Sequence, residues 1–407
     1  MAFLEVHLLK QFPPSLINRG EDGSPKACFF GGTERQRWSS QSQKRTMRQY
    51  FRTSGLVAPE HLAVRTKRLP QLLTDALVEL GHAPEEAGAL ALNTLWGANL
   101  LDTDPATADR PRANILLFLG YIEAKAIARA VHERAGELLA IAVPAHQVYG
   151  AGDAEGKTDS AEVRPVSKKD RQAKCPKEFQ TLGRGILRML DPATTIDLAL
   201  FGRMIATAPG SNVDGALCVA HAFSANRLID DIDFFTAVDD EAEAHESGIG
   251  HIGNSSLTSS TLYQYMALNL GQLHRTLGGD RDLTETAINA CWQAIVHAQP
   301  TAKATSTAPF TRPSLVLTVV RTGQPLSLAN GLTTAIQATR SRDVSLGAAV
   351  ALNRHWELIG ETYGHEDVVT ALHTHLFDEA IAVFPGKRLP IAEHGVTAAA
   401  RAIPYVA

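Results

Sequence analysis

The hydrophobic positions of this chain alternate between short strand-like runs and longer segments with helical spacing. Apolar or alternating runs bounded by turn residues predict strands at 3–9, 213–223, 258–268 and 314–320. Apolar residues at helical spacing predict helices at 40–52, 282–297, 326–338 and 346–363. Without its insertions, the chain has the order β-α-β-β-α-β up to residue 320. This order predicts an α+β protein with a ferredoxin-like or RRM-like fold.

A helical insertion interrupts this order. Leucine and alanine residues follow helical spacing at 72–80 and 115–131, and this character extends over residues 70–145. Residues 150–180 are rich in glycine, lysine, aspartate and serine and show no periodicity, which predicts a mobile surface loop.

The helix expected at 40–52 begins with an unusual polar and cationic sequence. Ser40 and Gln43 have capping-box spacing, and Lys44 and Arg48 lie four residues apart on one face. The N–H groups of the first turn point the same way as three polar side chains: Ser39, Ser40 and Gln41. Helix N-termini and cations both favour phosphate, so the pattern indicates a binding site for a polyanion. The alternative is a solvated amphipathic helix with scattered positive charge.

The overall charge of −4 over 407 residues favours no class of partner, but its distribution is uneven. Residues 1–70 contain twelve Lys or Arg and five Asp or Glu, whereas residues 227–246 contain eight acids and one arginine. A molecule that is positive in one place and negative in another can attract copies of itself head to tail.

The four cysteines are far apart in the sequence, which favours reduced and mostly buried thiols over disulfides: Cys28, Cys175, Cys218 and Cys291. The N-terminus lacks the long apolar region of a signal peptide, and no run approaches the roughly 18 apolar residues of a membrane span. We therefore expect a soluble cytoplasmic protein.

Five sequence blocks resemble, in order, the CasC-type backbone subunit of the type I-E CRISPR Cascade complex, in the RAMP superfamily. The first contains Phe-Phe-Gly-Gly and Ser-Ser-Gln-Ser-Gln-Lys-Arg, and the last contains Leu-Tyr-Gln-Tyr-Met-Ala-Leu-Asn-Leu. The blocks lie at 29–45, 197–204, 213–222, 231–240 and 262–270. The resemblance covers roughly residues 1–55 and 195–340.

The resemblance implies a right-hand shape with three parts and a C-terminal segment. These are an RRM-like palm at 1–60 and 195–345, a helical fingers insertion at 61–194, a β-hairpin thumb at 224–256, and a helical segment at 346–407. The resemblance also implies a non-catalytic protein without cofactor or metal, several copies of which assemble along one CRISPR RNA. Its further partners would be target DNA, through the guide heteroduplex, and the other Cascade subunits: the 5′-end cap, the 3′-end endoribonuclease, and the large and small subunits.

By position, the resemblance implies that eight residues bind the backbone of the guide RNA: Arg19, Lys26, Ser39, Ser40, Gln41, Lys44, Arg45 and Arg48. Met204 would wedge beside a kinked nucleotide, for which the alternative is a gap-filling core residue. Phe234, Phe235 and Thr236 would lie on the thumb. The sequence departs from the family at Thr33-Glu34 and at Gln43, which replaces an apolar residue. Both departures weaken the phosphate assignment of the loop but leave Lys44 and Arg48 untouched.

The chemistry of these side chains fits a protein that binds any guide sequence. Such a protein needs contacts with phosphate and 2′-hydroxyl groups rather than base edges. An aromatic residue on the thumb could separate bases by stacking. Successive strand residues point to opposite faces, so only one of Phe234 and Phe235 can face the RNA. The alternative for the pair is ordinary hairpin core.

The acidic segment around the thumb allows more than one interpretation. Clustered carboxylates could hold metal ions in a nuclease, but their spacing here is not that of a calcium loop. We instead expect four acids to face the positive surface of an adjacent copy, in an open head-to-tail array: Asp231, Asp233, Asp239 and Asp240. A solvated hairpin edge is the alternative. His373 and His375 with Asp378 could form half of a metal site, but a polar helix face is the better interpretation.

A metal-dependent ribonuclease is the rival hypothesis. Related ferredoxin-like CRISPR subunits cut RNA with an aspartate in the loop after the first strand, and Asp22 occupies that loop here. With its neighbours Glu21 and Gly23, however, Asp22 also fits the sequence of an ordinary turn. A free-standing RNA-binding protein outside any CRISPR complex is a third possibility.

Overall fold

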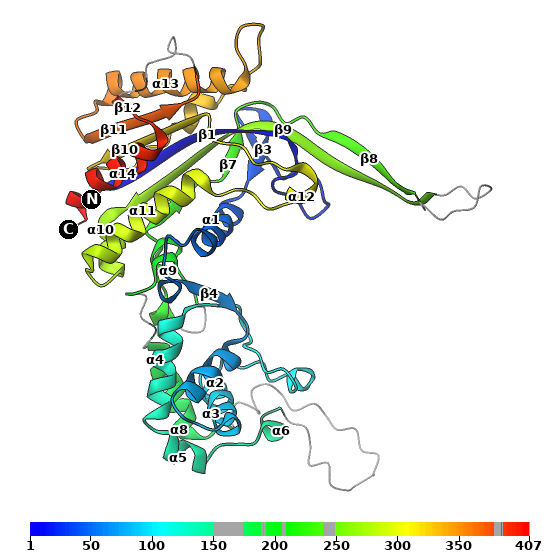
Figure 1. Ribbon diagram of the computed structural model, residues 1–407, viewed down its shortest axis with the longest axis vertical. Helices are drawn as coiled ribbons and strands as arrows, with labels where there is room; N and C mark the ends of the chain where they lie inside the picture. Colours follow the sequence, from blue (N-terminus) through cyan, green and yellow to red (C-terminus); the bar gives the residue numbers. More distant parts are fainter. Residues whose placement is uncertain are drawn as a thin grey trace. The chain divides into compact units, whose positions relative to one another are not determined.

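The computed structural model describes the chain except for residues 150–173, 189, 191–192, 206–208, 239–248, 378–383, 385 and 407. The chain forms two compact units. The first, here called the sheet unit, comprises Met1–Val57, Ala216–Arg275 and Gly279–Ala407. The second, the helical unit, comprises Ala58–Gly215 and Thr276–Gly278. The mixed α+β class expected from the sequence is confirmed (Figure 1).

The sheet unit is built on a sheet with the strand order β12-β11-β10-β1-β9-β7-β3-β2. β6 and β8 pair with different parts of β9, and the pairs are antiparallel except for β11 with β12. The strands are β1 Phe3–Ser15, β2 Ala27–Phe30, β3 Thr33–Trp38, β6 Leu217–Val219, β7 Ala222–Ser224, β8 Asp231–Val238, β9 Ile249–Asn269, β10 Leu315–Arg321, β11 Val368–His375 and β12 Lys387–Arg388.

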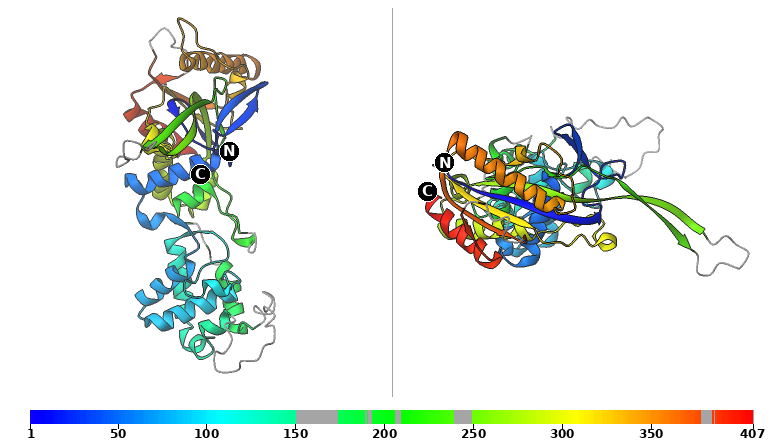
Figure 2. Two further views of the ribbon diagram at one scale, coloured as in Figure 1. Left: turned by 90° about the vertical axis from the view of Figure 1, so that its right-hand side faces the viewer. Right: turned by 90° about the horizontal axis from the view of Figure 1, so that it is seen from above.

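Helices cover both faces of this sheet, which explains why the central strand β1 is buried on both sides (Figure 2). α13 packs on the face of Leu9 and Leu317, and α11 lies on the opposite face, where Trp292 Nε1 donates to Thr318 Oγ1 at 3.1 Å. α1 and α14 lie on the α11 side. The helices of this unit are α1 Ser40–Ser54, α10 Leu270–Thr276, α11 Arg281–His297, α12 Ala304–Thr307, α13 Val344–Tyr363 and α14 Ile391–Ala402, with short 3-10 turns η4 Ala329–Leu332 and η6 Ile403–Tyr405.

The helical unit consists of short amphipathic helices around one apolar core and a small two-stranded sheet. α3 and α8 approach closely because glycine lies at their contact: a Cβ on Gly97 would be 2.1 Å from the Phe179 carbonyl oxygen. The elements are η1 Pro59–His61, β4 Ala63–Thr66, α2 Leu69–Glu79, α3 Pro84–Gly97, η2 Pro105–Thr107, β5 Leu117–Gly120, α4 Tyr121–His132, α5 Ala135–Ala140, α6 Ala145–Val148, α8 Lys177–Arg188, α9 Ile196–Phe201 and η3 Pro209–Ser211.

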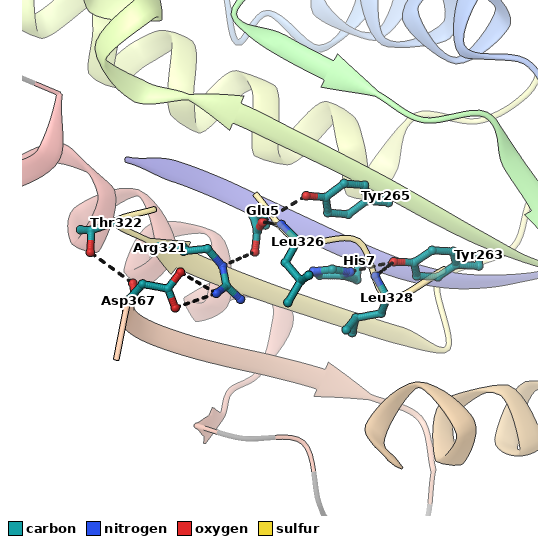
Figure 3. Close-up of polar contacts among 9 residues, drawn as sticks. All are labelled: Glu5, His7, Tyr263, Tyr265, Arg321, Thr322, Leu326, Leu328 and Asp367. Atoms are coloured by element: carbon teal, nitrogen blue, oxygen red, sulfur yellow. Dashed lines mark hydrogen bonds and ion pairs between the residues drawn. The ribbon is translucent and has the colours of Figure 1, made fainter. Parts of the chain in front are cut away.

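A buried polar network joins the centre of the sheet to the segment after β10 (Figure 3). The Glu5 carboxylate accepts hydrogen bonds from Tyr265, from Arg321 Nε at 3.2 Å and from the Leu326 backbone N–H. Arg321 also donates to both oxygens of Asp367 at 2.7 and 2.8 Å. Burial raises the pKa of Glu5. The hydrogen bond from the Leu326 backbone N–H and the positive charge of Arg321 lower this pKa, but by less than burial raises it.

This network explains why the helix expected at 326–338 is absent. Leu326 and Leu328 donate their backbone N–H groups to Glu5 and to the Tyr263 hydroxyl. The carbonyl groups of Leu332 and Thr333 accept from the Arg35 guanidinium, each at 3.1 Å. The Ile336 backbone N–H donates to the Ala225 carbonyl at 2.9 Å rather than to the Leu332 carbonyl, as a helix would require, so only the short turn η4 forms there.

Several other elements differ from the sequence-based expectation. The strands expected at 3–9, 258–268 and 314–320 and the helices at 40–52, 282–297 and 346–363 are confirmed. β1 continues past Pro13 and Pro14 because a register shift between Phe12 and Ser15 accommodates them. The strand expected at 213–223 is wrong in its bounds, since two short strands, β6 and β7, lie there. The helix expected at 115–131 begins only at Tyr121, because Leu117–Gly120 form strand β5.

Two further expectations concern the loop and the cysteines. Residues 150–173 of the expected loop lie outside the described residues, and α8 already begins at Lys177. All four cysteines are free thiols, as expected, although Cys218 is exposed. Among the described residues, no helix combines the length and apolar character that crossing a membrane requires.

Candidate nucleic-acid interface

The N-cap of α1 lies one residue earlier than the sequence suggested. Ser39 is the N-cap, and its hydroxyl accepts from the Ser42 backbone N–H at 3.3 Å. The capping box of Ser40 with Gln43 is therefore wrong. Gln43 is buried and donates to the carbonyl groups of Trp38 and Ala220 at 3.0 and 2.9 Å. This explains why a polar residue occupies a buried helix position here.

The remaining side chains of the first turns of α1 lie at graded depths. Lys44 and Arg48 are half-buried, whereas Gln41 and Arg45 are exposed. No acidic residue lies in the first turn. Burial lowers the pKa of Lys44. An anion beside Lys44 would stabilise its charged form, so this face of the helix favours phosphate.

The loop before β2 is attached to the start of α1. The Ser39 backbone N–H donates to Asn18 Oδ1 at 2.8 Å, and Lys26 N donates to the Asn18 carbonyl at 2.8 Å. Asn18 therefore holds the two ends of this loop beside the N-cap. Arg19 is exposed and Lys26 is half-buried. The loop thus places both predicted cations near the helix start.

One cation that sequence reasoning missed, Arg37, extends this positive surface, and His221 contacts it. Arg37 Nη1 donates to His221 Nδ1 at 3.4 Å, and Arg37 Nε donates to the Ala27 carbonyl. Burial, with Arg37 and Lys26 nearby, lowers the pKa of His221. The alternation of side chains along β3 could have indicated that Arg37 lies at the surface. No local pattern links it to His221, which is 184 positions away in the chain.

Asp22, the candidate catalytic residue, lies in a polar turn. Its carboxylate accepts from the Ser24 hydroxyl at 2.8 and 2.9 Å and from the Ser24 backbone N–H. These hydrogen bonds lower the pKa of Asp22. In the described part of the chain, no group of three or more His, Cys, Asp or Glu side chains could hold a metal ion.

The hairpin of β8 and β9 separates the predicted thumb residues onto two faces. Ile232, Phe234 and Thr236 share one face, and Asp231, Asp233 and Phe235 share the other. Phe234 is 72% exposed, whereas Phe235 is 48% exposed. The Phe235 ring lies over Gly253, where an added Cβ would be 2.4 Å from Phe235 Cζ. Phe234 is therefore the aromatic residue that projects from the hairpin.

The predicted acidic residues are only partly described. Asp231 and Asp233 are exposed near the base of β8. Asp239 and Asp240 lie outside the described residues. The Ser256 hydroxyl donates to Asp230 Oδ2 at 2.8 Å, so one further carboxylate is engaged within the hairpin.

Met204 belongs to the helical unit and is 84% exposed, so the interpretation as a gap-filling core residue is wrong. Met204 lines a cavity of about 310 Å³ together with Arg65, Leu116 and Phe118. The neighbouring Arg203 is buried and donates to both oxygens of Glu123 at 2.8 and 2.9 Å. This ion pair fixes the backbone that presents Met204.

His373 and His375 lie on strand β11, so the polar helix face expected there is wrong. Their rings stack at a centroid distance of 5.6 Å and are buried. The alternation of β11 puts both rings on the face that packs against α13, because each pairs with an apolar residue of β10. Asp378 lies outside the described residues.

Comparisons with known proteins give a consistent assignment. A sequence model of the CT1975-like protein family matches residues 4–389, and the chain belongs to this family. No curated protein matches the chain. A solved chain of a "CRISPR RNA-guided surveillance complex, pre-nicking" is similar over 98% of this chain and 100% of its own length, with 27% identity and a TM-score of 0.76. A chain of another CRISPR RNA-guided surveillance complex is similar over 98% and 99%, with 21% identity and a TM-score of 0.58, which shows a shared fold.

Proposed function

We propose that this protein is a non-catalytic RNA-binding backbone subunit of a CRISPR Cascade complex of type I-E. The family, and the likeness to a surveillance-complex chain over its whole length, support this proposal. The strand order β10-β1-β9-β7, with α1 and α11 on one face, supports the proposal that this unit is a ferredoxin-like palm. The helical unit would correspond to the fingers, and the β8–β9 hairpin to the thumb.

The observation that carries the proposal is the positive surface at the start of α1. It combines half-buried Lys44 and Arg48 with Lys26, Arg37 and a first turn that lacks acids. These groups bind phosphate without reading a base, as a protein that accepts any guide sequence requires. Multiple copies would hold the CRISPR RNA backbone and order the guide for pairing with target DNA, which then provides sequence specificity.

Contacts between copies would complete the assembly. Asp231 and Asp233 would face the positive surface of the next copy, and an array that does not close can follow a linear RNA. Phe234 would stack on a base, with Met204 beside a kinked nucleotide. The other Cascade subunits would bind the ends and sides of this array in the cytoplasm.

The decisive experiment replaces Lys44 and Arg48 together by alanine and measures the RNA that co-purifies with the protein. We expect co-purifying RNA to be lost, because two phosphate contacts disappear and each contributes about 0.7 to the slope of log affinity against log salt. Arg354→Ala on α13, an exposed helical arginine of the same unit, is the control for loss of a helical cation. Undiminished recovery of RNA with the double variant would overturn the proposal.

The absence of catalysis is part of the proposal and has its own test. The assembled complex is incubated with complementary RNA and magnesium, and the RNA is analysed on a denaturing gel. We expect intact RNA, because the Asp22 carboxylate binds Ser24 within its own turn. Cleavage that Asp22→Ala abolishes would instead establish a ribonuclease.

A further inference from the structure

The segment 299–313, which joins α11 to β10 and contains α12, is held in a defined conformation. We call it the 299–313 loop. Gln299 Nε2 donates to the Thr311 carbonyl at 3.0 Å, and Gln299 Oε1 accepts from Lys10 Nζ at 2.8 Å. The Thr311 hydroxyl donates to the Gln11 carbonyl at 2.6 Å. These bonds tie both ends of the loop to each other and to β1.

The loop adopts backbone conformations that are unusual for its residues. Lys303 has φ +47° and Ala308 has φ +40°, both in the left-handed region that favours glycine. Such conformations persist where the surrounding structure fixes them, and they are more common at functional sites. Lys303 Nζ donates to the Ser255 hydroxyl of β9 at 2.5 Å. The loop therefore lies against the base of the β8–β9 hairpin, as Figures 1 and 2 show.

Basic groups gather at the other end of the loop. Arg312 is exposed, and its Nη1 donates to His297 Nδ1 at 2.7 Å. Burial lowers the pKa of His297, and the charged neighbours that lower it further are both cations, Arg312 and Lys10. Burial and Arg312 lower the pKa of Lys10 to about 7. A phosphate group near Arg312 would bind its guanidinium and would favour the charged forms of His297 and Lys10.

An exposed aromatic residue, Phe310, lies between Lys303 and Arg312 in the sequence. Phe310 is 62% exposed, two residues before Arg312 and seven after Lys303. An aromatic ring combined with cations on a fixed loop is typical of surfaces that bind single-stranded nucleic acid. A protein partner with an acidic surface is the competing explanation, but charge complementarity alone would not require the exposed ring.

The loop is distinct from the positive surface at the start of α1. α1 approaches this region through Tyr50, whose ring lies 6.5 Å from that of His297. At 3.6 residues per turn, Tyr50 lies about 120° around the helix from Lys44. The Lys44–Arg48 face and the 299–313 loop thus lie on different flanks of α1.

We propose that the 299–313 loop is a second contact for single-stranded nucleic acid, in which Phe310 stacks on a base while Lys303 and Arg312 bind phosphates. This inference rests on the proposed function and extends it to a new part of the molecule. The ligand is either the guide RNA itself or the strand that pairs with it, since both offer the same chemistry. His297 would position the Arg312 guanidinium.

The test measures binding of fluorescein-labelled single-stranded RNA, and of DNA with the same sequence, to the full-length protein across a salt series. Phe310→Ala should weaken binding about 5- to 150-fold without changing the salt slope, because it removes stacking alone. Phe310→Trp should preserve affinity, and binding should quench its fluorescence. Lys303→Ala and Arg312→Ala should each reduce the slope by about 0.7. Tyr363→Ala and Arg354→Ala, on exposed positions of α13, are the matched controls.

The outcomes separate this inference from the proposed function. A loss confined to the RNA arm assigns the loop to the guide, and a loss confined to the DNA arm assigns it to the paired strand. If loop variants bind both nucleic acids normally while the Lys44/Arg48 double variant does not, the loop inference is overturned and the proposed function stands. If the loop variants impair only contacts between copies, the loop is a protein interface and the inference is likewise overturned. If the Lys44/Arg48 double variant also binds both nucleic acids normally, the loop inference and the proposed function are both overturned.

Discussion

At the scale of single residues, burial changes the meaning of the charge pattern. Arg35 is fully buried and donates to the carbonyl groups of Ser224, Ala225, Leu332 and Thr333. Lys10 is also buried. Both count among the basic residues of the N-terminal segment, so the surface there is less positive than the sequence indicates. No local pattern reveals this, because the acceptors of Arg35 are 189 to 298 positions away in the chain.

The buried His394 predicts a pH dependence of stability. Its Nδ1 lies 2.8 Å from the Thr374 hydroxyl, its ring is 5.2 Å from Trp292, and burial lowers its pKa to about 4. Between pH 4 and about 6.5 the unfolded chain binds a proton here that the folded chain does not, so stability rises with pH. Replacing His394 by asparagine, which keeps a hydrogen-bonding group near Thr374, should flatten this rise. Urea unfolding from pH 4.5 to 7.5 measures the effect.

The contribution of His394 is read from the difference between wild type and variant, because buried His7, with a pKa near 3, titrates in the same direction. A His394→Asn variant that keeps the full wild-type slope between pH 4.5 and 6.5 would show that His394 is protonated in the folded state.

At the scale of elements, glycine decides how closely α3 and α8 pack. A Cβ on Gly183 would lie 2.3 Å from the Ala98 backbone nitrogen, whereas nothing lies within 4 Å of one on Gly185. Gly183→Ala should therefore destabilise the protein by about 1–3 kcal/mol through overpacking. Gly185→Ala, in the same helix, should stabilise it by about 0.5–1 kcal/mol, since alanine favours helix. Thermal unfolding of both variants measures the contrast, and equal shifts in Tm would contradict this packing.

The two aromatic residues of the hairpin should also respond differently. Phe234→Ala removes an exposed ring and should weaken RNA binding by about 1–3 kcal/mol while stability stays unchanged. Phe235→Ala removes the ring over Gly253 and should loosen the hairpin, with faster hydrogen exchange in β8. Binding assays combined with hydrogen exchange separate these effects. Equal losses of binding without any change in exchange would show that both rings face the RNA.

The elements that the sequence predicted correctly have a strong local signal, and those it missed depend on distant partners. α1 and α13 have apolar residues at helical spacing, which identify them locally. The segment 326–338 also has helical spacing, but its backbone groups bind Glu5, Tyr263 and Arg35 instead. β11 went unrecognised because it follows a long helix and depends on β10 for its pairing. Likewise, the spacing of Lys44 and Arg48, together with the family resemblance, predicted these two residues, whereas Arg37 with His221 needed the fold.

At the scale of the whole molecule, the proposed association of copies rests on opposite charges in different parts of the sheet unit. The surface formed by α1 and its attached loop is positive, while Asp231 and Asp233 place negative charge on one face of the hairpin. Surface ion pairs between copies contribute little individually, at about 0–1 kcal/mol each. Repeated along an RNA, however, the same contact would make assembly cooperative and sensitive to salt.

Charge reversal of this face tests the assembly. Asp231→Lys with Asp233→Lys should reduce the number of copies that assemble on a long RNA, because the hairpin would then repel the positive surface of the next copy. A short RNA that holds one copy should bind as tightly as to wild type or more tightly, since added lysines attract phosphate. Mass photometry on the long RNA and fluorescence anisotropy on the short one measure the two properties. Glu357→Lys with Glu361→Lys, which reverses exposed acids of α13, is the matched control. Normal copy number with unchanged salt sensitivity would show that these aspartates are a solvated hairpin edge and that the copies meet elsewhere.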